Sequence, residues 1–519
     1  MIKKSKIPII LFALLLFELI FALFWGSKKE GYYIDEPWSY GLANSYYQPF
    51  LQNDDTYMKQ WQEPDFYYDY VVVNEGEAFS YDSVIYNQAN DVHPPFYYML
   101  LHTICSFFVG TYSKWFGLVL NLVFYIGTTL LLYAVTKEFI KEKSFMVYIP
   151  ALLYSACAGG ISTYLYIRMY MMLTFWGVLF LYLVLRMMNN HTVKPWSYML
   201  LCLCTIAGTL TQYYFLIYAF FISATYCIWR MFRKEFKEFF LYGLSVCGGI
   251  GVSYLLFPYM LNHIFLGDKG QEVLSSASGG IYDWFKRMWE YMQLIGEELF
   301  GSTGVLLIFL IIACLSLLIL LYYLIRHKQA ISVKLLSIYV LIAGYFSVIS
   351  LVSNEVADRY QSMLFPIIVL GFWITLYDAL KLLKKEKFVW IGVILYLITI
   401  PIQYKSGAIH YLGLGYDNAL NYVSTQLKEV PGIYVTKGDH LVINNLFFLG
   451  QQQNTYSIDK ENIEVLPTLL ENKKMDKLVL YVDIYYDEYE TAKKVAEMLA
   501  YDEVTLLYDN TFTQIYVLE

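Results

Sequence analysis

Long apolar runs, separated by short polar segments that are often basic, form the dominant pattern of this chain. A helix of about 20 apolar residues crosses the roughly 30 Å of hydrocarbon in a bilayer, and eleven runs approach or exceed that length. The expected spans are 9–25, 115–135, 145–162, 167–185, 196–211, 213–229, 239–261, 301–325, 335–352, 361–380 and 388–404. The pattern predicts a polytopic α-helical membrane protein.

Two apolar segments need separate treatment. The first run follows Lys3, Lys4 and Lys6, has no small-x-small cleavage site, and is read as a retained signal anchor. Segment 96–109 is too short for a full crossing and follows Pro94-Pro95, which suit a first helical turn. It is therefore predicted to be a re-entrant or interfacial helix.

Basic residues collect in alternate gaps between the spans. They are Lys137, Lys141, Lys143, Arg186, Lys194, Arg230, Arg233, Lys234, Lys237, Arg326, Lys328, Lys334, Lys381, Lys384, Lys385 and Lys387. The positive-inside rule then predicts a cytoplasmic N-terminus and an extracytoplasmic C-terminus in the cell membrane. Loops 27–113 and 262–300 fall on the outer side. The second loop carries an apolar stripe with helical spacing, from Ile281 to Ile295, typical of an interfacial helix that acts as an anchor or a lid.

The chain changes character after residue 405. We expect a membrane domain over 1–405 and an extracytoplasmic α/β domain over 406–519, with helices near 416–429, 460–472 and 486–499. Strands near 432–436, 478–484, 504–508 and 514–518 suggest a largely parallel sheet. This tail has 8 Lys and no Arg against 17 Asp and Glu, which argues against nucleic acid or anionic lipid as its partner.

Composition adds little beyond this division. The chain is 58% hydrophobic and 16% charged, as expected for a membrane protein. Its seven cysteines fall in apolar segments, with neither a disulfide framework nor zinc-ligand spacing.

Candidate chemistry gathers in the outer segments. Asp35 and Glu36 follow the first span, and Asp91 and His93 end the same loop. A carboxylate in an apolar setting can act as a general base, and a His at a helix start can bind phosphate. The plainer readings are solvated loop carboxylates and a helix-capping His93.

Two arginines at span ends are also candidates. Arg168 opens the fourth span among tyrosines, and Arg359 follows Asp358 before the tenth. The planar guanidinium suits phosphate, although Arg359 also stands four residues after Glu355 and can pair with it. One carboxylate cluster with several cations fits transfer of a sugar from a phosphate, because the phosphate is already a good leaving group. A glycosidase would need an acid and a base carboxylate.

The order of these residues carries a resemblance. A first span, Asp35-Glu36, a long outer loop ending in Asp91-Val92-His93-Pro94-Pro95, then Arg168-Met169-Tyr170 and Asp358-Arg359-Tyr360, resembles the GT-C glycosyltransferases. The nearest group is glycosyltransferase family 39, the bacterial branch related to protein O-mannosyltransferases and the lipid A aminoarabinose transferase. The resemblance covers roughly residues 1–400.

That resemblance implies an inverting transfer from a polyprenyl-phosphate sugar to a glycan, lipid or protein acceptor at the outer face. It implies Asp35 as catalytic base supported by Glu36, and His93, Arg359 and Arg168 at the donor phosphate. Asp91, Asp358 and Tyr360 are possible supporting residues.

No cofactor is required on this reading, although some family members use a divalent metal. Asp35, Glu36, Asp91 and Asp358 offer oxygen ligands for Mg²⁺ or Mn²⁺.

Two other classes of function stay open. A flippase or exporter of a lipid-linked saccharide would place polar residues along a path through the membrane, whereas the charges here gather at one surface. A receptor or scaffold with an acidic outer domain would leave the first 400 residues unexplained.

Overall fold

The computed structural model describes residues 7–51, 60–141, 144–277, 280–328, 332–353, 355–405, 409–437, 439–470, 476–510 and 512–519. The chain separates into two compact units, and each is described by itself. The helical unit comprises Met1–Gly26, Val92–Tyr97 and Gly117–His410. The sheet unit comprises Ser27–Asp91, Tyr98–Phe116 and Tyr411–Glu519. Segments far apart in sequence thus build both units.

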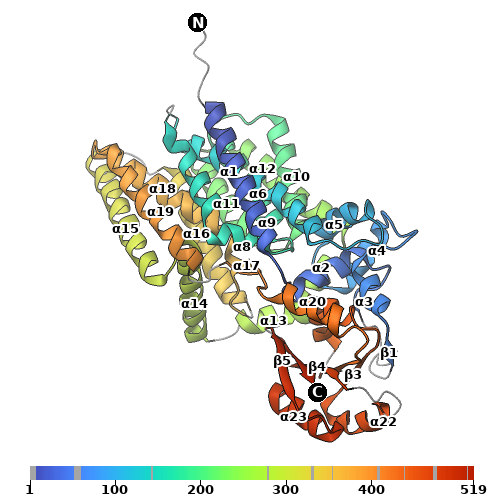
Figure 1. Cartoon of the computed structure of the whole chain (residues 1–519). Helices are drawn as coiled ribbons and strands as arrows, with labels where there is room; N and C mark the ends of the chain where they lie inside the picture. The colour runs from blue at the N-terminus through green and yellow to red at the C-terminus, as the bar shows by residue number, and fades with distance from the viewer. Residues whose placement is uncertain are drawn as a thin grey trace. The chain divides into compact units, whose positions relative to one another are not determined.

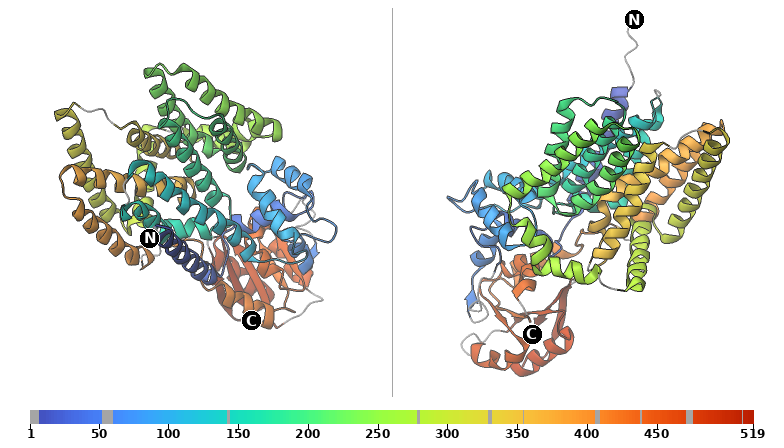
Figure 2. Two further views of the ribbon diagram at one scale, coloured as in Figure 1. Left: turned by 90° about the horizontal axis from the view of Figure 1, so that it is seen from above. Right: turned by 180° about the vertical axis from the view of Figure 1, so that it is seen from behind.

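The helical unit is a bundle of long apolar helices (Figure 1). Its long helices are α1 (Ile7–Lys28), α6 (Lys114–Phe139), α9 (Tyr170–Met188), α10 (Pro195–Thr211), α11 (Tyr214–Phe232), α12 (Phe236–Leu256), α14 (Ile281–Phe300), α15 (Thr303–Arg326), α16 (Val333–Val352), α18 (Phe365–Leu382) and α19 (Val389–Lys405). Shorter helices are α7 (Ile149–Ala156), α8 (Ala158–Leu165), α13 (Asp268–Ala277) and α17 (Asp358–Gln361). Helices α15, α16, α18 and α19 lie side by side in the views of Figures 1 and 2.

All eleven predicted spans overlap helices of this bundle. Among the described residues, nine segments are long and apolar enough to cross a membrane, and a bent pair makes a tenth if it counts as one span. Helix α10 is apolar but has only 17 residues. The polytopic helical fold expected from the apolar runs is therefore confirmed.

The bend in the third predicted span was not anticipated. Segments Phe145–Ala156 and Ala158–Leu165 meet at 56°, because Cys157 adopts an extended conformation between them. Gly159 just beyond it is closely packed, since a Cβ there would lie 2.8 Å from both the Glu298 carboxylate and the Phe365 ring. The small residue lets α8 approach α14 and α18.

A buried carboxylate joins the first span to its neighbour. Glu18 lies in the middle of α1 and is fully buried, and the Thr129 hydroxyl on α6 donates a 2.5 Å hydrogen bond to it. Near the end of α1, the Trp25 ring stacks on Tyr404 of α19 at 5.2 Å. Polar groups inside a membrane bundle are costly unless they find such partners, so these contacts orient α1.

The sheet unit combines short helices with one mixed sheet. Its helices are α2 (Asp35–Asn44), α3 (Pro64–Val71), α4 (Tyr81–Asn90), α20 (Tyr416–Gln426), α21 (Leu446–Leu449), α22 (Leu466–Leu470) and α23 (Glu488–Leu499). Helix α5 (Phe96–Ser106) enters this unit at Tyr98. The strands in the described part are β1 (Trp61–Gln62), β2 (Gly432–Val435), β3 (Thr455–Ile458), β4 (Leu478–Asp483), β5 (Val504–Asp509) and β6 (Thr513–Leu518), in the order β1-β3-β2-β4-β6-β5.

The expectation of a largely parallel sheet was wrong. Strand β2 pairs in parallel with β3 and β4, whereas the β1–β3, β4–β6 and β5–β6 pairs are antiparallel. Only residues 510–512 separate β5 from β6. A parallel neighbour needs a crossover of a dozen or more residues, so this connection permits only a hairpin. The four-residue strand β3, with the sequence Thr-Tyr-Ser-Ile, was too short and too polar to be predicted.

One face of the sheet carries an apolar core. Alternate residues of β2, β4 and β6, such as Ile433, Leu480 and Leu518, are fully buried. They pack against α22 and α23, which contribute Leu466 and Val495. The predicted α/β character of the tail is confirmed, and the two-residue period of the strands places these side chains on one face.

Residues of the long loop after α1 belong to the same folded body. Strand β1 pairs with β3, and the Tyr67 hydroxyl lies 2.6 Å from the Thr455 hydroxyl. The Gly31 and Gly413 backbones cross so closely that a Cβ on Gly413, which has φ +59°, would stand 2.4 Å from the Gly31 Cα. The tail therefore holds the loop that carries Asp35 and Glu36.

Candidate functional site

Arg168 and His93 meet in the helical unit. Arg168 is buried and lies in the break between α8 and α9, just before the span that it was predicted to open. His93 is half-buried and precedes α5. An Arg168 Nη2 atom lies 3.4 Å from His93 Nε2. Two nitrogen-bearing side chains, predicted separately from distant segments, are thus neighbours.

Arg359 is held by its own segment. It forms an ion pair with Glu355, as the plainer reading of the sequence predicted, and its guanidinium lies over the Tyr360 ring at 5.0 Å. The Arg359 side chain is 9% exposed whereas that of Glu355 is 51% exposed. A guanidinium has five donors in a fixed fork, so a pair with one exposed carboxylate is compatible with phosphate binding.

Tyr170 connects the two arginines. Its ring packs edge-on against Tyr360 at 6.3 Å. Arg359 lies over that Tyr360 ring, and Arg168 stands two positions before Tyr170 in the chain. Tyr360 in turn meets the ring of Tyr214 at 5.5 Å. The three predicted phosphate-binding residues, His93, Arg168 and Arg359, therefore share one region of the helical unit. We call the three residues the cationic cluster, after the charge of its two arginines.

Glu36 lies in the sheet unit in a fully buried ion pair. Its Oε2 is 2.9 Å from Lys29 Nζ, and both side chains have no exposed surface. The same oxygen accepts a 2.7 Å hydrogen bond from the Tyr33 backbone, and Lys29 also donates to the Tyr411 carbonyl at 2.5 Å. Burial lowers the pKa of Lys29, and the charge of Glu36 offsets part of that effect. No local sequence pattern marks Lys29 as the partner of Glu36.

Asp35 has a different environment from its neighbour. It is the first residue of α2 and is partly exposed, and the Ser39 hydroxyl donates to its backbone carbonyl at 2.8 Å. A carboxylate in the first turn is stabilised by the positive end of the helix dipole. Of the two adjacent acids, Asp35 is the accessible one and Glu36 is the anchored one.

Aromatic side chains surround the start of α2. The Tyr112 ring lies 5.7 Å from Tyr32, 4.8 Å from Tyr40 and 4.5 Å from Phe447. The Tyr40 hydroxyl donates to the Ser113 carbonyl at 2.7 Å. Packing of this kind removes rotamer freedom from the segment and fixes the direction in which α2 leaves the loop.

Asp91 ends α4 in the sheet unit. Its backbone N–H donates to the carbonyls of Asn87 and Gln88, and its charge acts on the buried Tyr70 hydroxyl. Two residues later, His93 already belongs to the helical unit. The chain therefore leaves the sheet unit after Asp91 and enters the helical unit at Val92.

A further group of possible ligands was only partly anticipated. Glu298, Asp358 and His410 each place a ligand atom within 4.8 Å of the others. Asp358 was a candidate, but Glu298 and His410 were missed. Glu298 continues the apolar stripe that runs from Ile281 to Ile295 along α14, and a carboxylate on such a stripe is the signal that could have found it. No local pattern marks His410.

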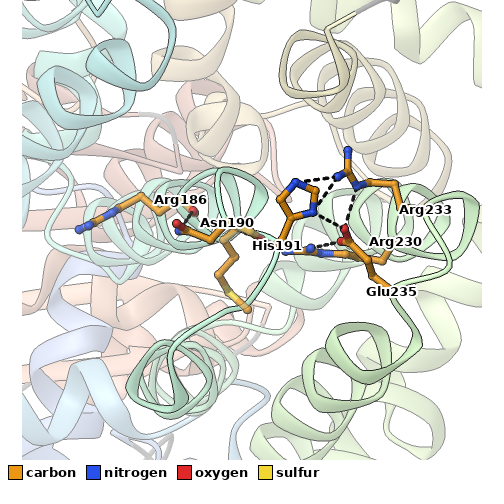
Figure 3. A network of polar contacts seen from close by, with 7 residues as sticks. Arg186, Asn190, His191, Arg230, Arg233 and Glu235 are labelled. Carbon is orange, nitrogen blue, oxygen red and sulfur yellow. Dashed lines mark hydrogen bonds and ion pairs between the residues drawn. The ribbon is translucent and has the colours of Figure 1, made fainter.

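A second polar network joins the α9–α10 and α11–α12 connections (Figure 3). Glu235 pairs with Arg230, with Arg233 at 3.0 Å and with His191 at 2.8 Å. Arg230 also donates to the Asn190 carbonyl at 2.9 Å. Although burial raises the pKa of Glu235, the hydrogen bonds from these three side chains outweigh it and lower the pKa to about 2. The network ties two basic loops together, and its residues are not among the catalytic candidates.

Taken with the apolar bundle, these arrangements define the class of fold. The chain is a multi-pass helical membrane protein whose fold is similar to that of GT-C glycosyltransferases, the group that the order of its residues resembles. No protein-family model matches the chain, and no curated protein is detectably similar to it in sequence.

The chain is similar in fold to several solved structures. The chain is similar to ArnT from Cupriavidus metallidurans, solved bound to undecaprenyl phosphate, with a TM-score of 0.56 and 10% identity over 99% of this chain and 98% of that one. It is also similar to the Archaeoglobus fulgidus oligosaccharyltransferase in its apo form, with a TM-score of 0.55 and 12% identity over 99% of this chain and 74% of that one. The oligosaccharyltransferase AglB from Archaeoglobus fulgidus, in complex with an inhibitory peptide and a dolichol phosphate, gives a TM-score of 0.50 at 11% identity over 99% of this chain and 74% of that one.

Proposed function

We propose that this chain is a glycosyltransferase that moves a sugar from a polyprenyl-phosphate donor to an acceptor at the outer face of the membrane. The observation that carries the proposal is the cationic cluster, in which Arg168 lies 3.4 Å from His93 and Arg359 lies over the Tyr360 ring, which packs against Tyr170. The shared fold adds support, because ArnT was solved with undecaprenyl phosphate and AglB with dolichol phosphate.

In the proposed reaction, His93, Arg168 and Arg359 bind the donor phosphate. The bond between the anomeric carbon and the phosphate oxygen breaks, and the phosphate leaves with the electron pair. Fixed cations stabilise the charge that grows on the leaving phosphate. The cluster therefore binds the donor and lowers the barrier to departure of its phosphate.

Asp35 is the proposed general base. It takes the proton of the acceptor hydroxyl or amine as that atom bonds to the anomeric carbon from the side opposite the phosphate, which inverts the sugar. Its partial exposure and its place in the first turn of α2 suit a carboxylate that is ionised before the reaction. Glu36 is a positioning residue, because its carboxylate is held by Lys29 and Tyr33.

Orientation is part of the proposal. The basic loops, including the Glu235 network of Figure 3, are placed in the cytoplasm by the positive-inside rule. Loop 27–113 and the tail domain after residue 405 are then extracytoplasmic. Labelling of single cysteines in intact cells with an impermeant maleimide tests this, and labelling at Arg233→Cys but not at Asp65→Cys would refute it.

The catalytic test uses purified protein and a radiolabelled undecaprenyl-phosphate sugar. General bases contribute about 10²–10⁴-fold, so Asp35→Asn should lower product formation at least about 100-fold while undecaprenyl phosphate still binds. Asp65→Asn is the matched control, since Asp65 is an exposed acid in the first turn of α3 in the same unit. Near-normal transfer by Asp35→Asn would remove Asp35 as base. A flippase would give no product with any variant.

A further inference from the structure

We propose that Glu298, Asp358 and His410 bind one divalent transition-metal ion, such as Zn²⁺ or Mn²⁺, within the helical unit. Each residue contributes one ligand atom, and all three atoms lie within 4.8 Å of one another. The site shares no residue with the cationic cluster, although the Arg359 backbone N–H donates a 2.8 Å hydrogen bond to Asp358. The inference does not rest on the proposed sugar transfer.

The distance between two of the ligands fits a shared ion. His410 Nε2 lies 3.4 Å from Glu298 Oε1, which is beyond the usual 2.7–3.2 Å of an N–H···O hydrogen bond. Two ligands that bind Zn²⁺ at about 2.0–2.1 Å with tetrahedral geometry stand about 3.3 Å apart. The pair is therefore spaced as two ligands of one ion.

Glu298 is the second observation that points to a cation. Its carboxylate is fully buried, and within the described part of the chain neither oxygen has a hydrogen-bond donor apart from the approach of His410 at 3.4 Å. Asp358, also buried, brings a second carboxylate into the same group of ligand atoms. Two carboxylates in a low-dielectric interior are stable only with a cation or with a shared proton.

Packing prevents the carboxylate from turning away. A Cβ at Gly159 would lie 2.8 Å from Glu298 Oε2, so α8 closes one side of the site. On another side, the His410 backbone donates to the Ser162 hydroxyl at 3.1 Å. The ligands are thus fixed by α8, α14, α17 and the segment after α19.

The chemistry of the ligands selects the metal. One imidazole nitrogen with two carboxylates suits Zn²⁺ or Mn²⁺, whereas Mg²⁺ and Ca²⁺ prefer oxygen ligands alone. His410 is 40% exposed, which gives the ion a way in. A bound ion would join Glu298 to His410, which is 112 positions later in the chain, and stabilise the helical unit.

The experiment uses the full-length protein in detergent, stripped with EDTA and titrated with Zn²⁺, Mn²⁺ or Mg²⁺. We expect mass spectrometry of the metal content to find one equivalent of Zn²⁺ or Mn²⁺ after desalting. The Tm should rise on metal addition, because a ligand that binds only the folded state stabilises it. Mg²⁺ should have a much smaller effect.

Three variants assign the site. Glu298→Gln and His410→Gln should lose the bound equivalent and the shift in Tm. Glu297→Gln, which removes the same charge from the adjacent exposed position, should keep both. Should Glu298→Gln fail to fold, His410→Gln at the exposed side of the site still decides the question. If the stripped protein shows no change in Tm on addition of any of the three ions, the two acids share a proton instead of binding a metal. If His410→Gln binds the metal as wild type does, the ion lies elsewhere. Either result overturns the proposal.

Discussion

The buried pair of Lys29 and Glu36 should be one of the strongest single contributors to the sheet unit. Neither side chain has exposed surface, and their atoms lie 2.9 Å apart. Removing one partner leaves a buried charge without compensation, which costs about 3–5 kcal/mol. A domain of 150–250 residues loses roughly 2–4 °C of Tm per kcal/mol. Lys29→Met or Glu36→Gln should therefore lower the Tm by roughly 6–20 °C.

The double variant separates the effect of losing the ion pair from the effect of leaving one buried charge unpaired. Lys29→Met with Glu36→Gln leaves no unpaired charge, so its loss in Tm should be clearly smaller than the sum of the two single losses. Thermal unfolding of the purified protein gives the Tm. Hydrogen exchange in peptides that cover α2 reports whether the loss is local to this loop.

A control pair lies in the same unit. Lys477 and Glu519 are 2.6 Å apart, but each is 40% exposed, and solvent screens such pairs. Lys477→Met should leave the Tm almost unchanged. If Lys29→Met has as little effect as Lys477→Met, or if the two single losses simply add, the pair does not hold α2 in place and the reasoning fails.

Three further predictions use other contacts. Gly413→Ala should lower the Tm more than Gly76→Ala. Both glycines have positive φ, so an alanine at either position is strained by about 1–2 kcal/mol, but of the two only the methyl at position 413 would collide with another backbone. Equal losses of Tm would contradict this. The pKa of Glu235 is lowered to about 2 from an ordinary 4.5, so its stabilisation should be complete above about pH 4.5 and disappear as the pH falls toward 2. The difference in Tm between wild type and Glu235→Gln should shrink over that window, and a constant difference would count against the network. Arg168→Lys keeps the charge but loses the planar fork, so undecaprenyl phosphate should bind about tenfold more weakly, the equivalent of one charge-assisted hydrogen bond. Arg186→Lys, an exposed control, should bind normally, and unchanged affinity in Arg168→Lys would remove Arg168 from the donor site.

Much of the fold follows from patterns within short windows. A run of apolar residues has the same preference for a bilayer wherever its neighbours lie, so α1, α6 and α15 were expected close to where they occur. The stripe from Ile281 onward likewise predicted α14. The bend at Cys157 was missed, because it depends on how closely α8 packs against Glu298 and Phe365.

The candidate site was predictable only as a set of residue types. Motif order named Asp35, His93, Arg168 and Arg359 as candidates, but not their partners. Lys29 reaches Tyr411, which is 382 positions away, and no local spacing contains that information. Glu36 was expected beside Asp35 as a catalytic group, and its ion pair with Lys29 now makes it a positioning residue in the proposal.

The sequence by itself determined that this chain is a multi-span helical protein with an α/β tail, and it named the acids and basic residues that are candidates for chemistry. Hydrophobicity and helical or strand periodicity are properties of neighbouring residues, so they can be read along the chain. Only the tertiary structure decided which charges meet, which strands run antiparallel, and that Glu298, Asp358 and His410 converge. Those outcomes depend on contacts between distant segments. A buried charge that lacks its partner costs several kcal/mol of stability, so the folded structure decides which charges pair.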